Sequence, residues 1–104
     1  KLFEKRSDIT AVFAANDLMA AGAIKAIREK GLTIPQDIAV AGFDDEDFTA
    51  AMEPPLTTVN KPRMEMGHEA AGLMLQLFSE RLLEPREIVL PTRLVIREST
   101  KVPE

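Results

Sequence analysis

The first half of the chain alternates between apolar runs and a helical stripe. Residues 9–15 (ITAVFAA) form a short apolar run of strand-forming residues, and residues 37–43 (DIAVAGF) form a second one. Between them, residues 17–30 carry apolar side chains at helical spacing, with Asn16 as a suitable N-cap and Gly31 at the position of a left-handed C-cap. This order predicts a right-handed βαβ unit whose parallel strands are buried on both faces.

The second half contains one long amphipathic helix and several shorter segments. Residues 48–52 favour one or two helical turns, and residues 56–59 (LTTV) have strand-like side chains. A helix is predicted over residues 63–82, and residues 87–90 and 93–96 are predicted to be strand segments. The apolar stripe of this helix is expected to be core and comprises Met66, Ala70, Leu73, Met74, Leu77 and Phe78.

These elements predict an α/β fold with a partial doubly wound parallel sheet. Two or three parallel-type strands and two helices are too few to complete a doubly wound domain, because its sheet needs helices on both faces. The chain alone would therefore leave apolar strand surface exposed, and we interpret it as a fragment of a larger domain.

Composition narrows the classes of function. The net charge of −4 and the lack of a basic stripe disfavour direct contact with nucleic acid through these residues. The absence of Cys excludes disulfides, thiolate catalysis and Cys-ligated metals. No apolar run approaches the roughly 20 residues that a membrane-spanning helix needs, so no membrane partner is expected.

Polar residues follow both predicted strands of the βαβ unit. Asn16 follows the first strand and Asp44 follows the second, so parallel pairing would bring both to the edge where such sheets bind ligands. An amide donates and accepts, and a carboxylate accepts from two hydroxyls, which suits a sugar, nucleoside or other polyol. The competing interpretation is structural, because Asn and Asp after strands also cap helices and form turns.

Other chemistries lack necessary parts. The acidic run from Asp44 to Asp47 has neither the alternation nor the glycine turn of a calcium loop, so a solvated turn is the simpler interpretation, and no metal is expected. The single histidine, His68, lies on the polar face of a predicted helix, which leaves a Ser or Thr nucleophile without a base. The glycines form no phosphate-binding pattern. We therefore expect no catalytic residues and no cofactor.

Four ordered blocks of sequence resemble the C-terminal portion of LacI/GalR-type repressors. The resemblance covers residues 9–100 and is carried by AVFAANDLMAAGAIKAIREKGLTIPQDIAVAGFDD, PPLTTVNKP, MGHEAAGLML and IVLPTRLVIREST. It implies a periplasmic-binding-protein-like core of type I, with two lobes that close on a small effector. An N-terminal helix-turn-helix domain, absent from this chain, would read operator DNA.

The resemblance also implies how the chain is divided. Residues 1–57 would be the βαβ part of the C-terminal lobe, and residues 58–62 would cross between the lobes. Residues 63–82 would be a helix of the N-terminal lobe, and residues 87–98 would form a returning strand. The fragment would thus contain parts of both lobes.

Binding roles follow from the same resemblance. Asn16 and Asp44 match positions that contact the effector, and Lys61 and Arg63 fall beside the cleft between the lobes. Lys61 stands where Gln is commonest in the family, which leaves room for an anionic ligand. The surface of a homodimer would comprise Ala21, Lys25, Arg28, Phe48, Ala51 and Met52.

The leading hypothesis is an effector-binding transcription regulator of the cytoplasm that acts by population shift. The alternative is a periplasmic sugar-binding protein of a transport system, whose fold is the same. An enzyme of doubly wound fold is a weaker third possibility.

Overall fold

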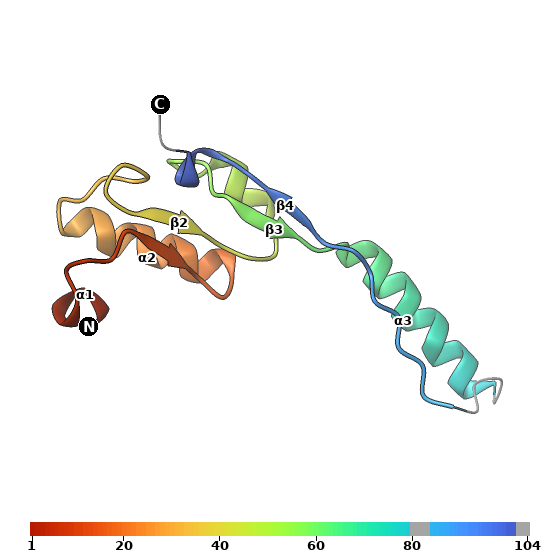
Figure 1. Cartoon of the computed structure of the whole chain (residues 1–104). Helices are drawn as coiled ribbons and strands as arrows, with labels where there is room; N and C mark the ends of the chain where they lie inside the picture. Colours follow the sequence, from red (N-terminus) through yellow and green to blue (C-terminus); the bar gives the residue numbers. More distant parts are fainter. Residues whose placement is uncertain (80–83, 102–104) are drawn as a thin grey trace. The chain divides into compact units, whose positions relative to one another are not determined.

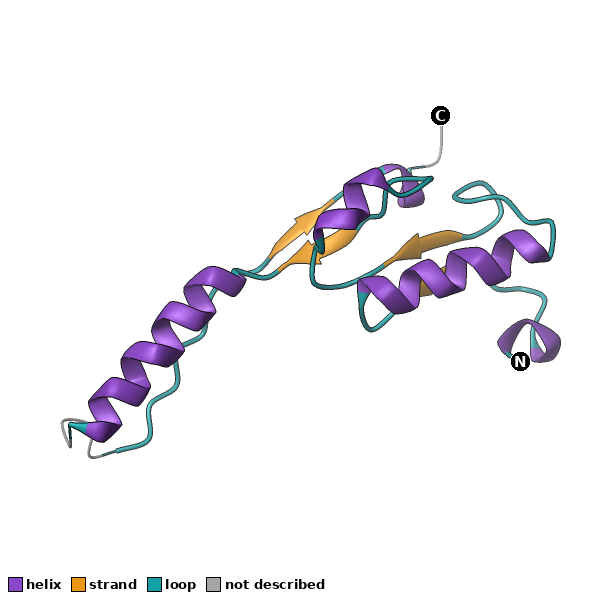
Figure 2. Ribbon diagram, turned by 180° about the vertical axis from the view of Figure 1, so that it is seen from behind, coloured by secondary structure: helices purple, strands orange, loops and turns teal. Residues whose placement is uncertain are grey.

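The computed structural model describes residues 1–79 and 84–101, which form two compact units. The first unit contains residues 1–60 and the chain from residue 93, and the second contains the described residues between 61 and 92. The elements, drawn in Figures 1 and 2, are α1 (Leu2–Lys5), β1 (Ala11–Phe13), α2 (Asp17–Glu29), β2 (Ala39–Ala41), η1 (Asp47–Ala51), β3 (Thr58–Asn60), α3 (Arg63–Phe78), β4 (Arg93–Val95) and η2 (Glu98–Thr100).

The predicted βαβ unit is present in the first unit. Strand β1 pairs with β2 in parallel, with Ala11 opposite Ala39 and Phe13 opposite Ala41. Helix α2 covers one face of this pair (Figure 2). The other face is open in this chain, since Phe13 is 67% exposed. The prediction that β1 is buried on both faces is therefore wrong for the chain by itself, because no helix of the first unit covers the second face.

Local signals fix both ends of α2. The side chain of Asn16 accepts a hydrogen bond from the backbone N–H of Met19 at 2.8 Å and so caps the helix, as expected. At the other end Gly31 has a φ of +76°, the left-handed conformation that ends helices and that glycine adopts most easily. The loop to β2 is then closed by Asp37, which accepts from the backbone N–H and the hydroxyl of Thr33, both at 2.8 Å.

The core of the first unit lies between α2 and the strands. One face of α2 is packed against β2 and the segment that precedes β3. The buried hydrophobic residues are Ala14, Ala20, Ile24, Ile27, Ile38, Val40 and Leu56. Ile24 and Ile27 of the stripe at helical spacing thus form the core contact of α2 as the sequence predicted, whereas Leu18, at the same spacing, is 73% exposed.

Strand β3 has neighbours of both orientations. Isolated parallel bridges join Ala41 to Thr57, just before β3, and Asp44 to Asn60, within β3. The segment that contains β3 thus extends the parallel pairing beyond β2. Its regular partner is β4, which pairs with it antiparallel, with Thr58 opposite Val95. The strand pairing of the first unit is therefore mixed, with β1 and β2 parallel and the returning strand β4 antiparallel to β3. The returning chain runs back along the strand by which it left.

The second unit contains α3, whose apolar stripe is exposed. The helix ends at Phe78, earlier than the predicted end at residue 82, and residues 80–82 lie outside the described part of the chain. None of its residues is buried, and Leu77 and Phe78 are 52% and 75% exposed. Most of the stripe that the sequence predicts as core is therefore exposed among the described residues of this unit, and Leu73 is half-buried.

The predicted returning strand over residues 87–98 is mostly not a strand. Residues 87–90 form no ladder, and only Arg93–Val95 pairs, as β4. Pro91 lies between the two segments and cannot donate a ladder hydrogen bond. The apolar side chains of residues 87–90 gave a strand pattern, but a strand also needs a partner edge, which these residues lack within the described part of their unit.

Candidate functional site

The segments that leave β1 and β2 lie side by side at one edge of the sheet. The backbone N–H of Ala14 donates to the carbonyl of Ala41 at 2.9 Å, and that of Asp17 donates to Phe43 at 3.0 Å. These two bonds bring the residues after each strand, Asn16 and Asp44, to the same edge, as parallel pairing predicts.

Asn16 is half-buried and presents two different polar atoms. Its Oδ1 accepts from the Met19 N–H in the cap of α2, while its backbone is extended with a φ of −152°. The cap occupies the acceptor, so the Nδ2 amide is the group suited to donating to a ligand hydroxyl. The structural and the binding interpretations of Asn16 are therefore compatible.

Asp44 lies in a backbone conformation that few residues other than glycine adopt. Its φ is 117° and that of Asp45 is 59°. A non-glycine residue in such a region costs on the order of 1–3 kcal/mol, and it persists only where the surrounding structure holds it. Here the Asp44 N–H donates to the carbonyl of Val59 at 3.0 Å, which ties the loop to β3.

Asp17, the first residue of α2, is completely buried and anchors this loop. Its carboxylate accepts from the Thr58 hydroxyl at 2.6 Å and from the Glu46 N–H at 2.7 Å. A Cβ at Gly42 would lie 2.5 Å from Asp17 Oδ1, so only glycine leaves room for the carboxylate there. The acid that begins the helix therefore joins α2, the acidic loop and β3.

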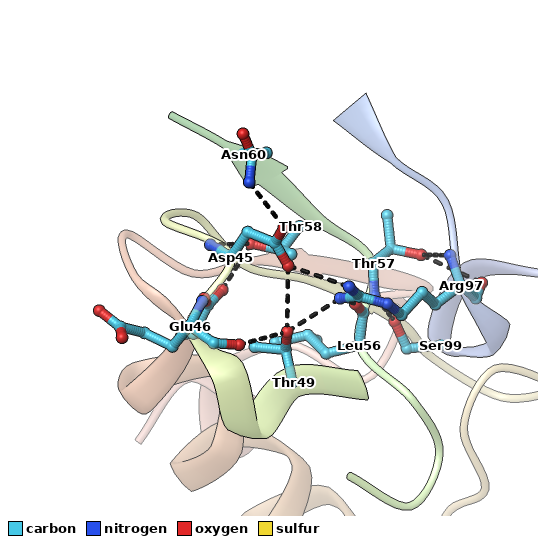
Figure 3. A network of polar contacts seen from close by, with 10 residues as sticks. Asp45, Glu46, Thr49, Leu56, Thr57, Thr58, Asn60, Arg97 and Ser99 are labelled. Atoms are coloured by element: carbon cyan, nitrogen blue, oxygen red, sulfur yellow. Dashed lines mark hydrogen bonds and ion pairs between the residues drawn. The ribbon is translucent and has the colours of Figure 1, made fainter. Parts of the chain in front are cut away.

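Asp45 is the centre of a second group of polar contacts (Figure 3). Its Oδ1 lies 3.0 Å from Nη2 of Arg97, and its Oδ2 accepts from the Asn60 amide at 2.8 Å. Arg97 Nη1 also donates to the Thr49 hydroxyl at 2.9 Å and to the Leu56 carbonyl at 2.8 Å. One guanidinium thus joins the acidic loop, η1 and the chain that enters β3.

The pKa of Asp45 reflects two opposing effects. Burial acts to raise the pKa of this carboxyl, while hydrogen bonds from Asn60 and Arg97, the Arg97 charge and the Thr49 hydroxyl act to lower it. The net result is a pKa below the ordinary aspartate value of 3.8. Asp45 is therefore a carboxylate at neutral pH, held as the acceptor of this group of contacts.

Lys61 and Arg63 belong to the second unit. Arg63 is the exposed first residue of α3, and its backbone N–H donates to the carbonyl of Lys61, which is half-buried, at 2.8 Å. These two cations are thus close in the chain at the start of the helix. Their predicted role toward a ligand stays a prediction.

The residues predicted for a dimer surface lie on α2, on η1 and at Met52, which directly follows η1. A hollow of about 460 Å³ is lined by Ala21, Ile24, Lys25, Arg28, Glu29, Met52 and Glu53, four of which belong to the predicted set. Arg28 donates to the Glu53 carbonyl and so holds the loop after η1 against α2. Phe48, on η1, is 41% exposed.

Little else in the described residues offers reactive chemistry. His68 is exposed on α3, as the sequence predicts. Over residues 1–79 and 84–101, no three His, Asp or Glu side chains gather as a metal site. The helices in these ranges are too short or too polar to cross a membrane.

Sequence reasoning did not identify three residues that shape the site, which are Asp17, Asp45 and Arg97. Asp17 received no role, Asp45 was one of four acids in a predicted solvated turn, and Arg97 lay in the predicted returning strand. Arg97 and Asp45 are 52 residues apart, and such a pair leaves no local signal. Gly42, which precedes the acidic run, was the one sequence feature that could have indicated a buried Asp17, because it allows the close approach of that side chain.

Comparisons with known proteins agree on the family. Residues 3–100 match the model of the periplasmic binding protein-like domain. The HTH-type transcriptional regulator CelR of Thermobifida fusca is 41% identical over 99 residues, which are 95% of this chain and 29% of that protein. The chain thus spans about three tenths of the length of this relative.

Solved structures give the same result. A transcriptional regulator CelR–cellobiose complex has a TM-score of 0.91 at 42% identity, over 94% of this chain and 30% of that one. A lac repressor dimer bound to operator and an anti-inducer has a TM-score of 0.84 at 35% identity, over 95% and 30% of the two chains. The chain therefore belongs to the periplasmic binding protein-like domain family, within the group formed by LacI-type transcription regulators.

Proposed function

We propose that this chain is part of the effector-binding domain of a bacterial transcription regulator, and that Asn16 and Asp44 contact a sugar, nucleoside or related polyol. One observation carries the proposal: the segments that contain Asn16, whose Oδ1 caps α2, and Asp44 lie side by side at the carboxyl edge of parallel strands, where such folds bind ligands. Asn16 Nδ2 would donate to one ligand hydroxyl, and Asp44 would accept from others.

The relatives favour a regulator over the alternative of a periplasmic transport protein. The similar proteins described above are DNA-binding regulators, and one of them is described in complex with cellobiose. A related disaccharide or monosaccharide is therefore the first class of effector to test. An effector that binds one arrangement of the domain better than another would shift its population and change the affinity for operator DNA.

The further parts of the proposal are based on the resemblance of this chain to its family. Operator DNA would be read by a domain outside these residues, and the regulator would act in the cytoplasm as a binder that catalyses no reaction. Residues 1–57 would lie in one lobe, residues 58–62 would cross, and the helix from Arg63 would lie in the other. Lys61 and Arg63 would contact the effector by resemblance, and Lys61 would suit an anionic group.

A homodimer is proposed through the surface on α2 and η1. Ala21 and Met52 supply apolar area at the hollow, and exposed Phe48 adds an aromatic side chain of the kind that interfaces use. Lys25 and Arg28 lie at the same hollow, and Ala51 is exposed on η1. A self-complementary surface of this kind fits a two-fold interface.

The test is calorimetric titration of the full-length regulator with cellobiose, lactose, ribose and a sugar phosphate. For a probe that binds, Asp44→Ala should weaken binding by about 1–3 kcal/mol, because a ligand hydroxyl loses its charged acceptor. Ala50→Ser, on the exposed surface of η1, is the matched control and should leave the affinity unchanged. Equal affinities of the wild type and Asp44→Ala would contradict the proposed role.

A further inference from the structure

The acidic loop that contains Asp44 is held in place by contacts with β3, with α2 and with the chain that follows β4. We propose that Asp45 and Arg97 are positioning residues, which keep Asp44 in the conformation that accepts from the effector. The inference rests on the proposed function, since it assigns a role toward the carboxylate that would bind the ligand. It adds two residues to which neither the sequence pattern nor the family resemblance gave a role.

The backbone of the loop is fixed at three consecutive amides. The N–H of Asp44 donates to the Val59 carbonyl at 3.0 Å, that of Asp45 to the Thr58 hydroxyl at 3.3 Å, and that of Glu46 to Asp17 at 2.7 Å. The two positive φ angles lie within this stretch. A conformation that is costly by itself is thus imposed from outside the loop.

The side chain of Asp45 supplies the remaining restraint. It accepts from Asn60 at 2.8 Å, from Arg97 at 3.0 Å and from Thr49 at 3.2 Å, and it is only 14% exposed. A carboxylate with three donors cannot rotate without losing charge-assisted bonds. Because Asp45 follows Asp44 directly, fixing the side chain of one residue limits the backbone freedom of the other.

Arg97 is itself fixed, so it can serve as an anchor. Its backbone N–H donates to the Thr57 hydroxyl at 2.8 Å, and its guanidinium, 20% exposed, reaches the Leu56 carbonyl, Thr49 and Asp45. A planar guanidinium can serve these acceptors simultaneously, which an ammonium cannot do in the same geometry. Arg97 therefore connects the chain entering β3 with the acidic loop (Figure 3).

A purely structural role predicts a different result from a positioning role. Ser99 provides the comparison, because it is fully buried in the same region but bonds to other partners. Its hydroxyl donates to the Val40 carbonyl at 2.6 Å and accepts from the Thr57 N–H at 2.8 Å. Ser99→Ala should lower stability without changing the conformation of Asp44.

The experiment is a double-mutant cycle on the full-length regulator, with affinity measured by calorimetry for whichever of cellobiose, lactose and ribose binds. Asp45→Asn should weaken binding about tenfold when Asp44 is present, and less than about twofold in the Asp44→Ala background. Arg97→Lys, which keeps the charge but loses the planar fork, should follow Asp45→Asn. Ser99→Ala should leave the affinity within about twofold of the wild type.

The outcomes separate this inference from the proposed function. If Asp44→Ala weakens binding and Asp45→Asn does not, the positioning role is overturned and the proposed function stands. Equal losses for Asp45→Asn in both backgrounds would make Asp45 merely structural, which also overturns the inference. If Asp44→Ala changes nothing, the proposed function itself fails, and the inference fails with it.

Amide hydrogen exchange of the ligand-free protein tests the positioning role without a bound ligand. In Asp45→Asn and Arg97→Lys, the amides of residues 44–46 should exchange with solvent at least tenfold faster than in the wild type, because their restraints are lost. In Ser99→Ala these amides should keep the wild-type rates. Unchanged exchange at residues 44–46 in both loop variants would overturn the inference even if none of the three sugars binds.

Discussion

The two units of the chain differ in how far each completes its own packing. The first unit buries Ile27, Val40 and Leu56 completely, and its one buried carboxylate, Asp17, has two donors among the described residues. In the second unit the long helix α3 has no buried residue, and its apolar stripe is open to solvent. The first unit thus fixes the residues at the candidate binding edge by its own contacts, whereas the second contains a helix whose apolar side chains are largely exposed.

The difference suggests where rigidity is needed. A protein carboxylate that accepts hydrogen bonds from a ligand must be held in place before the ligand binds. A core that is complete by itself and has satisfied polar groups provides this rigidity. The stripe of α3 matches the core-facing pattern of a helix in a larger domain, and we expect chain outside these residues to cover it.

The largest difference between the two units is expected in the loss of unfolding free energy when an apolar side chain is shortened. Leu56→Ala should lower the free energy of unfolding by about 2–5 kcal/mol, because Leu56 is fully buried in the first unit. Leu77→Ala on α3 should cost less than about 0.5 kcal/mol in the 104-residue chain.

In the full-length regulator, Leu77→Ala should approach the cost of Leu56→Ala, because the stripe is then covered. Urea denaturation followed by circular dichroism measures both variants. If Leu77→Ala remained neutral in the full-length protein, the expectation that α3 packs against other chain would be wrong.

The buried contact of Asp17 should give the next effect. Thr58→Val keeps the shape of the side chain but removes the hydroxyl that donates to Asp17, and the buried carboxylate then lacks one of its two donors. We expect a loss of about 1–3 kcal/mol in unfolding free energy. Thr58→Ser keeps the hydroxyl and is the matched control. Similar stabilities of Thr58→Val and Thr58→Ser would show that the contact is unimportant.

Asn16 allows its two roles to be separated. Asn16→Ala removes the cap of α2 and should cost about 1 kcal/mol of stability. Asn16→Asp retains an oxygen that can accept from the Met19 N–H, so its stability should equal that of the wild type. Both variants lose the Nδ2 donor and should bind effector more weakly. Wild-type affinity in Asn16→Asp would limit Asn16 to capping.

The smallest effect expected is a pH dependence from Asp45. Its pKa in the folded protein is below the ordinary value of 3.8, so the unfolded chain binds the proton more readily. The stabilisation is complete above pH 3.8 and is lost as the pH falls through the lower folded-state pKa. The difference in unfolding free energy between wild type and Asp45→Asn should therefore shrink in acid. A difference that grew as the pH fell would contradict this account.

Much of the first unit could be predicted because its signals are local. Helical spacing gave α2, Asn16 and Gly31 marked its ends, and two apolar runs gave the parallel strands. The edge position of Asn16 and Asp44 followed from the rule that parallel strands end together. Each of these inferences uses residues within one element or its immediate flanks.

The remaining features depend on contacts between distant parts of the chain. Arg97 and Asp45 meet only after β4 returns along β3, and the antiparallel pairing of these strands is set by that return. The positive φ of Asp44 is imposed by bonds from other elements and leaves no mark in the residue type. Residues 87–90 show the opposite error, since a strand pattern without a partner edge remains irregular.

The most direct test of the central claim is amide hydrogen exchange on the full-length regulator, with and without a saturating sugar that binds. The account predicts slower exchange in the sugar-bound state at the amides after β1 (residues 16–19) and in the acidic loop (residues 44–46). It predicts no such change in the loop from residue 33 to residue 37, at the opposite edge of the sheet. Protection confined to other segments, with these amides unchanged, would contradict an effector site at the carboxyl edge of β1 and β2.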